Sequence, residues 1–219
     1  MNRENQNEPS TVDEILRAIE EKGDTAEYIY RGESKHFEAV SSNLYRVFLE
    51  RKDFNVEAEQ FDIEVVQKGI LEEAKKYLRR TDSDCEFLVE MQHYGGKTNL
   101  IDFTTDCFVA LFFACEQFAS ENGRIICQRK ELISPSIKEP PEPINRVVAQ
   151  KSIFVRPSKG FINPNEDDVI NIPANIKVPM LEHLQMAHDI STETIYNDIH
   201  GFIRYQNDHL EAYVAFYRS

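Results

Sequence analysis

Apolar residues recur at helical spacing near both ends of the chain, and short apolar runs lie between these segments. The first helical pattern covers residues 12–19, where Thr11 and Glu14 form a capping box and Gly23 ends the helix. The same periodicity predicts helices over 56–78, 86–93, 108–118, 180–188 and 192–207, with a short helical turn over 41–46.

Short apolar runs bounded by glycine or polar residues predict strands. These are expected at 28–31, which ends at Gly32, and at 100–103, 124–128, 146–149, 152–155 and 175–178. The four prolines within 134–143 indicate an exposed loop. Helices early in the chain and short strands later indicate an α+β fold.

Two of the predicted helices differ in their apolar surface. The helix at 108–118 is apolar nearly all round and is therefore expected to be central. The helix at 56–78 is amphipathic. Its expected inward residues are Ala58, Phe61, Val65, Leu71, Ala74 and Leu78.

The 219 residues suffice for a single domain with a sizeable core. The 38 acidic residues exceed the 25 basic ones and give a net charge of -13, which argues against tight nonspecific binding to nucleic acid. Residues 1–9 are polar with no signal peptide, and the longest apolar run, 107–115, is too short to span a bilayer, so we expect a cytoplasmic protein without a membrane partner. The four cysteines lack CxxC spacing and are expected to be buried thiols, and the scattered histidines predict no metal site.

Three sets of polar residues lie at the ends of apolar runs, where burial is costly unless the side chains satisfy one another or meet a ligand. The first set is Tyr30-Arg31-Gly32. The Arg31 guanidinium offers a planar fork of donors that suits a phosphate or a carboxylate, with a surface ion pair as the alternative. Gly32 allows a turn or a close approach of the backbone.

The second set lies within residues 91–106 and joins a predicted helix, a strand and the apolar helix. His93, followed by Tyr94, can act as a general acid or base, bind a ligand or the Asp102 carboxylate, or have a structural role. Asp102, Thr104 and Thr105 offer a carboxylate, hydroxyls and a helix N-terminus, which favour phosphate or ribose oxygens. Ordinary helix capping is the alternative.

The third set, residues 145–154, contains Gln150 between two apolar runs. A glutamine amide can bond a hydroxyl and a carbonyl but cannot act as a base, and a bulge or edge position is the alternative. The sequence contains no P-loop, GxGxxG, GxSxG or HExxH motif, so the common nucleotide-binding and hydrolase signatures are absent.

Eight sequence blocks together resemble the FRG domain family, which is named for its aromatic-Arg-Gly opening and is widespread in bacteria and phages. They are Tyr30–Glu33, Asn43–Arg46, Gln92–Gly95, Thr98–Thr104, Ala110–Ala114, Gly123–Ile125, Arg146–Gln150 and Ile195–Gly201. The resemblance spans about 30–205. It implies an FRG domain over 27–210, after a disordered start and N-terminal helix over 1–26 and before a C-terminal tail or strand over 211–219.

The order of these motifs is also similar to that of ADP-ribosyltransferases of the Arg–Ser–Glu type. This similarity implies an α+β fold with a split sheet of short strands, packed with an N-terminal helical portion. In those enzymes the arginine holds a phosphate of NAD, the serine/threonine motif shapes the nicotinamide-ribose pocket, and the glutamate holds the ribose 2′-hydroxyl. By this resemblance Arg31 would hold phosphate, Thr104 and Thr105 would line the pocket, and Gln150 would replace the glutamate.

Gln150 departs from that pattern, because an amide can hold the 2′-hydroxyl but carries no charge to stabilise an oxocarbenium-like state. Asp102, Asp106 or Glu33 can supply the charge, with His93 orienting one of them. Glu33 itself stands where the family often has glutamine.

The sequence therefore predicts one pocket with NAD as its substrate. The expected catalytic residues are Arg31, His93, Asp102 and Gln150, and the expected NAD-binding residues are Arg31, Gly32, Tyr94, Thr104 and Thr105. The first hypothesis is an enzyme that binds NAD or a related nucleotide and transfers ADP-ribose to an unidentified macromolecule, as a toxin or phage-defence effector. The alternatives are a catalytically inactive nucleotide-binding or protein-recognition module, favoured by Gln150, and a purely structural adaptor.

Overall fold

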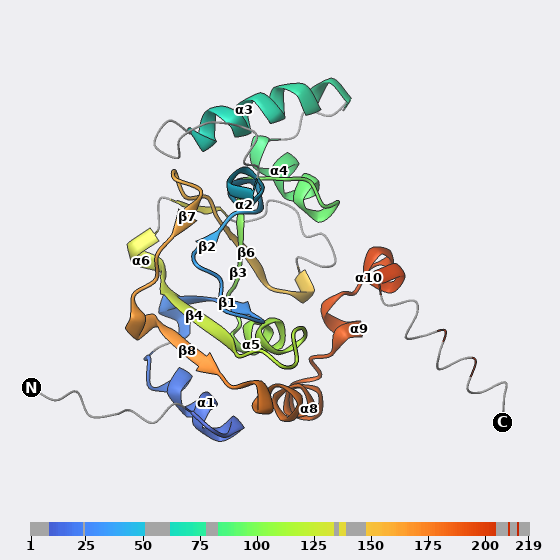
Figure 1. The fold of residues 1–219 in the computed structure, drawn as a ribbon. Helices are drawn as coiled ribbons and strands as arrows, with labels where there is room; N and C mark the ends of the chain where they lie inside the picture. Colours follow the sequence, from blue (N-terminus) through green and yellow to red (C-terminus); the bar gives the residue numbers. More distant parts are fainter. Residues whose placement is uncertain are drawn as a thin grey trace, which may run out of the picture.

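A six-stranded antiparallel sheet forms the centre of the protein, with its strands in the order β5-β6-β3-β1-β4-β8 (Figure 1). The computed structural model describes residues 9–23, 25–50, 62–77, 83–133, 136–138 and 148–204, with Leu210 and Val214. The strands are β1 (Tyr28–Glu33), β3 (Ile101–Thr104), β4 (Gly123–Arg129), β5 (Ile137–Lys138), β6 (Ser152–Val155) and β8 (Val169–Ile172). A second sheet pairs β2 (Val40–Ser41) with β7 (Phe161–Ile162).

Helices surround the sheets, which confirms the predicted α+β class. The helices are α1 (Val12–Glu20), α2 (Asn43–Glu50), α3 (Ile63–Ala74), α4 (Asp84–His93), α5 (Cys107–Cys115), α6 (Lys130–Ile133), α8 (Lys177–His188), α9 (Thr192–Ile195) and α10 (Ile199–Arg204). Figure 1 shows α1, α5 and α8 at one end of the molecule and α2, α3 and α4 at the other.

The core lies on both faces of the sheet, because successive side chains of a strand point to opposite faces. On one face Tyr28 and Tyr30 of β1 pack with α1, α5 and α8. On the other face Ile29 of β1 packs with Ile101 and Phe103 of β3. Helix α5 is buried as its apolar sequence predicts, and it caps its own N-terminus with Asp106, whose Oδ1 accepts from the Phe108 N–H at 2.8 Å.

Gly32 lets β1 and α5 approach each other closely. A Cβ at this position would lie 1.8 Å from the Ala110 carbonyl oxygen and 2.6 Å from the Ala114 nitrogen. Strand β1 therefore continues through Gly32 to Glu33, rather than ending at Gly32 as expected. The two alanines of the apolar helix and this glycine form one packing contact, although they are far apart in the sequence.

Helix α1 has the predicted N-cap but only half of the predicted capping box. The Thr11 hydroxyl accepts from the Glu14 N–H at 3.2 Å. The Glu14 carboxylate instead accepts from the Ser10 N–H at 2.7 Å, one residue before the cap. The helix thus begins where the sequence predicts, but the Glu14 carboxylate accepts from the Ser10 N–H and not from the Thr11 N–H of a capping box.

Helix α3 begins at Ile63, where Asp62 is the N-cap. Leu71 is buried as expected, whereas Val65 is 66% exposed, so its predicted inward position is wrong. The buried face includes Gln67, whose Oε1 accepts from the Asn99 N–H, and a polar anchor of this kind is invisible to an apolar periodicity. The predicted start of this helix at 56–61, and Leu78, lie outside the described residues.

Residues 175–178 were expected to be a strand, but they belong to a 3-10 turn (Ala174–Ile176) and the start of α8. Burial does not follow the alternation that suggested a strand, because the adjacent Ile176 and Lys177 are both buried and Val178 is exposed. The Lys177 ammonium donates to three backbone carbonyls, those of Ser34, Gln117 and Phe118. Strand β8, which the sequence analysis did not predict, pairs with β4 just before this turn.

The remaining corrections concern the second half of the chain. The helix expected over 192–207 is two helices, α9 and α10, because Tyr196 leaves the helical region and Asp198 caps α10 by accepting from the Gly201 N–H. The proline-containing segment contains β5, which pairs with β6. In the strand expected over 146–149, Val148 and Ala149 are helical, and the other two residues lie outside the described part.

Candidate functional site

One cavity of about 370 Å³ collects polar side chains from distant parts of the sequence. Its volume lies within the range of small-molecule sites. Strand β1, helix α4, strand β3, the turn before β6 and the residue after α9 all contribute to its wall. The residues of the predicted site that line it are Arg31, Gly32, His93, Asp102, Thr104 and Gln150.

Arg31 is held rigidly at the edge of this pocket. Its Nε donates to Glu33 Oε1 at 3.0 Å, and its Nη1 donates to the Asp102 carbonyl oxygen at 2.8 Å. Its Nη2 makes no hydrogen bond to the described residues, and the side chain is 16% exposed. A guanidinium fixed in this way keeps one terminal nitrogen available to an anion without losing further side-chain entropy.

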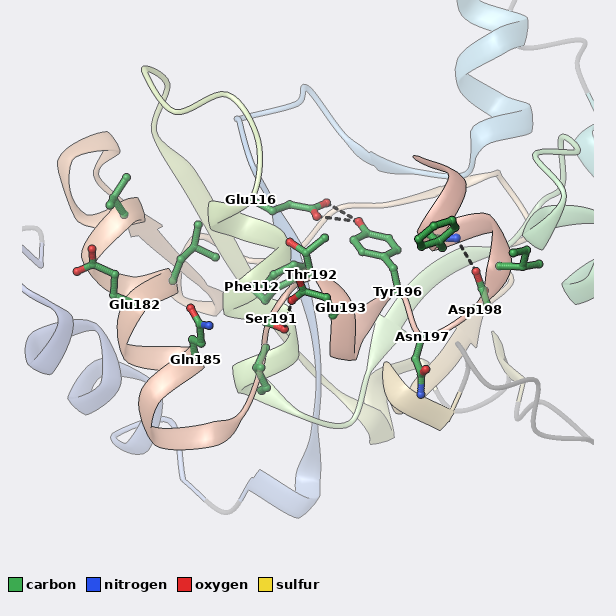
Figure 2. A pocket seen from close by; sticks show the side chains of 16 residues that line it. Phe112, Glu116, Glu182, Gln185, Ser191, Thr192, Glu193, Tyr196, Asn197 and Asp198 are labelled. Carbon is green, nitrogen blue, oxygen red and sulfur yellow. Dashed lines mark hydrogen bonds between the residues drawn. The ribbon is translucent and has the colours of Figure 1, made fainter. Parts of the chain in front are cut away.

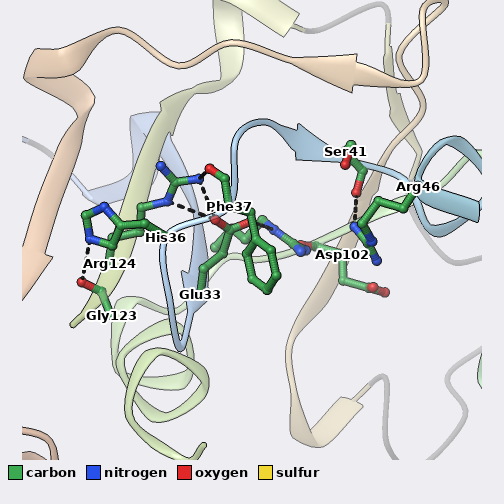
Figure 3. Close-up of polar contacts among 9 residues, drawn as sticks. Glu33, His36, Phe37, Ser41, Arg46, Asp102, Gly123 and Arg124 are labelled. Atoms are coloured by element: carbon green, nitrogen blue, oxygen red, sulfur yellow. Dashed lines mark hydrogen bonds and ion pairs between the residues drawn. The ribbon is translucent and has the colours of Figure 1, made fainter. Parts of the chain in front are cut away.

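Glu33 is buried between two arginines, Arg31 and Arg124 (Figure 3). The Arg124 Nε donates to Glu33 Oε2 at 2.8 Å. Both carboxylate oxygens are therefore engaged by cations, and the cluster has a net positive charge. Glu33 was a candidate for the charge that stabilises an oxocarbenium-like state, but the two arginines already neutralise it.

A third arginine, Arg46 of α2, lies near Asp102 (Figure 3) and close enough to Arg31 to feel its charge. Its Nη1 donates to the Ser41 carbonyl. Burial and the neighbouring Arg31 guanidinium both lower the pKa of Arg46. Arg46 belongs to one of the family-like blocks, where no motif indicated a role for it, and it adds to the positive potential around Asp102.

Asp102 presents its carboxylate to the pocket. Its Oδ1 accepts from Gln92 Nε2 at 2.6 Å, and the Gln92 Oε1 accepts from the buried Thr98 hydroxyl. Asn43 completes this network, because its Oδ1 accepts from the Thr98 N–H at 2.7 Å. Residues from three of the family-like blocks thus hydrogen-bond to one another and orient the Asp102 carboxylate.

The electrostatics of Asp102 combine two opposing effects. Surrounding protein raises the pKa of the Asp102 carboxyl above its usual value, and the Arg31 guanidinium opposes that increase. The side chain nevertheless remains open to the pocket. A carboxyl of this kind can exchange a proton with a ligand more readily than a surface aspartate.

His93 lies beside Asp198, a carboxylate that the sequence did not indicate as its partner. Its Nε2 lies 3.6 Å from Asp198 Oδ2, and both side chains are about 10% exposed. Asp198 precedes α10, so the C-terminal helices bring this partner to α4. The Asp102 carboxylate, one of several partners that the sequence allows for His93, accepts from Gln92 Nε2.

The hydroxyl residues of the predicted site divide into two groups. Thr104 is buried and lines the pocket, but its Oγ1 also accepts from the Asp106 N–H at 3.0 Å, as a capping residue would. Thr105 is exposed and does not line the pocket. Tyr94 is also outside it, with 65% of its surface exposed.

Gln150 lines the pocket from the turn before β6, where its Nε2 donates to the Ile195 carbonyl at 3.3 Å. Its amide oxygen makes no hydrogen bond to the described residues, so it can accept one from a ligand hydroxyl. Asp106, another candidate carboxylate, caps α5 and pairs with Lys151 at 2.6 Å outside the pocket.

Glu116 and Tyr196 are pocket residues that the sequence analysis missed. The Tyr196 hydroxyl lies 2.7 Å from each Glu116 carboxylate oxygen (Figure 2). Glu116 follows the last residue of α5, so an acidic residue ending an apolar helix was the available signal. Besides Glu33, which the two arginines engage, the pocket is therefore lined by two further carboxylates, Asp102 and Glu116.

Other chemistries find little support in the described residues. They contain no group of three or more His, Cys, Asp or Glu side chains placed to hold a metal ion. Burial raises the pKa of Cys107 to about 11 and those of Cys115 and Cys127 to about 12, so these thiols are poor nucleophiles. No helix in the described part has the length and apolar character needed to cross a bilayer.

Comparison with models of protein families gives a match in the N-terminal part of the chain. The family model described as the FRG domain matches residues 26–123. The matched part carries Arg31, His93, Asp102 and Thr104, whereas Gln150 lies beyond it. Neither the curated proteins nor the solved structures contain a significant match to the chain.

Proposed function

We propose that the chain is an FRG-domain protein whose pocket binds NAD and which transfers ADP-ribose to a macromolecule; the match of residues 26–123 to the FRG domain model supports the first part. The observation that supports this is the convergence of Arg31, Asp102 and Gln150 on one cavity. The resemblance to Arg–Ser–Glu type ADP-ribosyltransferases assigns the first and last of these to phosphate and to the ribose 2′-hydroxyl. As a biological role we propose that of a toxin or phage-defence effector, in keeping with that activity.

The residues present suit this chemistry. The available Arg31 nitrogen can donate to a phosphate oxygen, and the net positive charge of the Arg31–Glu33–Arg124 cluster favours an anion. The Gln150 amide oxygen can accept from a ribose hydroxyl.

The missing glutamate charge has two candidate substitutes in the pocket, Asp102 and Glu116. Cleavage breaks the bond between the ribose C1′ and the nicotinamide nitrogen, and the bonding electrons leave with nicotinamide. Positive charge then develops on the ribose, and a carboxylate held in place by hydrogen bonds stabilises it without reorganising. The bond from Gln92 holds Asp102, and the bond from Tyr196 holds Glu116.

Incubation of the purified protein with labelled NAD and a cell lysate tests the proposal. We expect label on a macromolecule together with release of nicotinamide. Asp102→Asn should slow nicotinamide release about 100-fold, since loss of one preorganised electrostatic contact typically costs that much. Arg31→Ala should also lose activity, and Arg31→Lys should recover little, because lysine lacks the fork of donors.

A matched control is Arg17→Ala, which removes an exposed arginine from α1 outside the pocket. It should behave as wild type. Neither transfer nor nicotinamide release by the wild-type protein, with NAD and lysate in excess, would refute the enzymatic proposal.

A second candidate is a catalytically inactive nucleotide-binding or protein-recognition module, which the neutral Gln150 favours. A ligand that binds only the folded state raises its melting temperature. A thermal shift with NAD that Arg31→Ala abolishes, in the absence of turnover, would select nucleotide binding. Neither a shift nor turnover would leave the protein-recognition module.

A further inference from the structure

A second and larger cavity, of about 1070 Å³, shares lining residues with the first. Figure 2 shows the side chains that line it. Helix α8 forms one wall, and the segment carrying α9 and α10 forms the other. We call this cavity the C-terminal groove. It is defined by its carboxylates Glu116, Glu182, Glu193 and Asp198, together with apolar and neutral polar residues.

The charge of the C-terminal groove has one sign. The described residues that line it include four carboxylates but no lysine, arginine or histidine. Glu182 is exposed, and neither it nor Glu193 forms an ion pair with a basic residue in the described part of the chain. Like charges on facing walls raise the negative potential between them, so the groove favours a cationic occupant.

The groove also exposes large apolar and aromatic side chains. Val178 is 57% exposed, Ile199 64% and Phe202 47%. Apolar side chains gathered in a concave surface with polar residues between them are typical of sites for protein segments. Aromatic faces beside carboxylates favour arginine over lysine, because the planar guanidinium can stack on a ring while donating to an acid.

The two cavities share a wall. Glu116 and Tyr196 line both of them, and the hydrogen bond between them, 2.7 Å long, lies at the boundary. A side chain that reaches this end of the groove would therefore lie next to Glu116 and next to a ligand of the first pocket.

We propose that the C-terminal groove docks a basic, arginine-containing polypeptide segment, and that an arginine of this segment accepts ADP-ribose. The docking part is independent of the proposed function, whereas the acceptor part rests on it. Apolar residues of the segment pack on Val178, Ile199 and Phe202, and its cations face Glu182 and Glu193. An arginine nitrogen forms the new bond to the ribose C1′ as the bond to nicotinamide breaks, and its proton passes to the Glu116 carboxylate.

Fluorescence anisotropy without NAD tests the docking part. The probe is a labelled synthetic peptide of arginine and leucine at helical spacing, and the matched probe carries neutral citrulline at each arginine. We expect the arginine peptide to bind more tightly. The double variant Glu182→Gln/Glu193→Gln should weaken its binding about fivefold to tenfold, as expected for the loss of two exposed ion pairs.

The control is Glu72→Gln/Glu131→Gln, which makes the same change in net charge at exposed positions outside the groove. Screening over roughly 8 Å at physiological ionic strength should leave its peptide affinity near the wild-type value. Equal affinity for the two peptides, or an equal loss in both double variants, would overturn docking. So would sedimentation data showing that a second copy of the chain occupies the groove, with Glu182→Gln/Glu193→Gln dissociating that dimer.

The acceptor part is tested with the same arginine peptide and labelled NAD. Label on an arginine of the peptide is the expected result. Release of nicotinamide with the bound peptide left unlabelled would overturn it. An absence of nicotinamide release would refute the proposed function instead, while the binding measurements still decide whether the groove docks the peptide.

Discussion

Replacement of Gly32 by alanine should separate β1 from α5 and destabilise the protein. The new Cβ would lie 1.8 Å from the Ala110 carbonyl oxygen, whereas ordinary contacts begin at 3.4 Å. Strand and helix must therefore move apart by about 1.6 Å, because the near atoms, the Ala110 oxygen and the Ala114 nitrogen, belong to the backbone and not to a flexible side chain. Overpacking of a rigid core costs about 1–3 kcal/mol, so we expect about 3 kcal/mol or more. This is a large part of the stability of about 5–15 kcal/mol that is usual for a folded protein.

Thermal unfolding followed by circular dichroism measures this effect. For a chain of this size the loss should lower the melting temperature by about 6–12 °C. Gly69→Ala is the matched control, because Gly69 lies in α3 and a methyl group added there would have no atom within 4 Å. That change should stabilise the protein by about 0.5–1 kcal/mol, since alanine is the better helix former. A Gly32→Ala protein that melts with the wild type would refute the packing role of this glycine.

Three further predictions concern buried and pocket residues. Lys177→Met leaves three backbone carbonyls without their donor and should cost about 3 kcal/mol in urea denaturation; an unchanged midpoint would show that water replaces the ammonium. The pKa of Asp102 in the folded state lies above its ordinary value of 3.8. The free energy of unfolding of the wild type should therefore rise relative to that of Asp102→Asn as the pH falls through the raised pKa towards 3.8, and a constant difference over this range would contradict the shift. Tyr196→Phe removes the hydrogen bond to Glu116 and should cost about 2 kcal/mol in thermal unfolding, with no change expected if Glu116 finds another donor.

The sequence predicted the central elements of the fold because local patterns specify them. Helix α5 is apolar on all sides and is buried, and strands β1, β3, β4 and β6 lie within a few residues of their expected positions. The prediction failed where a distant partner decides burial. Val65 is exposed and Gln67 is buried, because a backbone N–H of Asn99 meets the Gln67 amide.

The same distinction holds for the site. The sequence named Arg31, Asp102 and Gln150, because polar side chains beside apolar runs need partners or a ligand. It did not indicate that His93 faces Asp198, that Gln92 holds Asp102, or that Glu116 joins the pocket. Each of these pairings requires a contact between segments whose separation in the chain carries no information about distance in space.

Periodicity and residue type alone determined helix α5, the positions of strands β1, β3, β4 and β6, and which side chains have the chemistry to bind an anion or a ribose. Hydrogen bonding and burial between distant segments decided which of those side chains share a cavity and which partner each one meets. The reason is physical: local backbone preferences act over a few residues, whereas the desolvation of a polar group is offset only by the atom that packs against it.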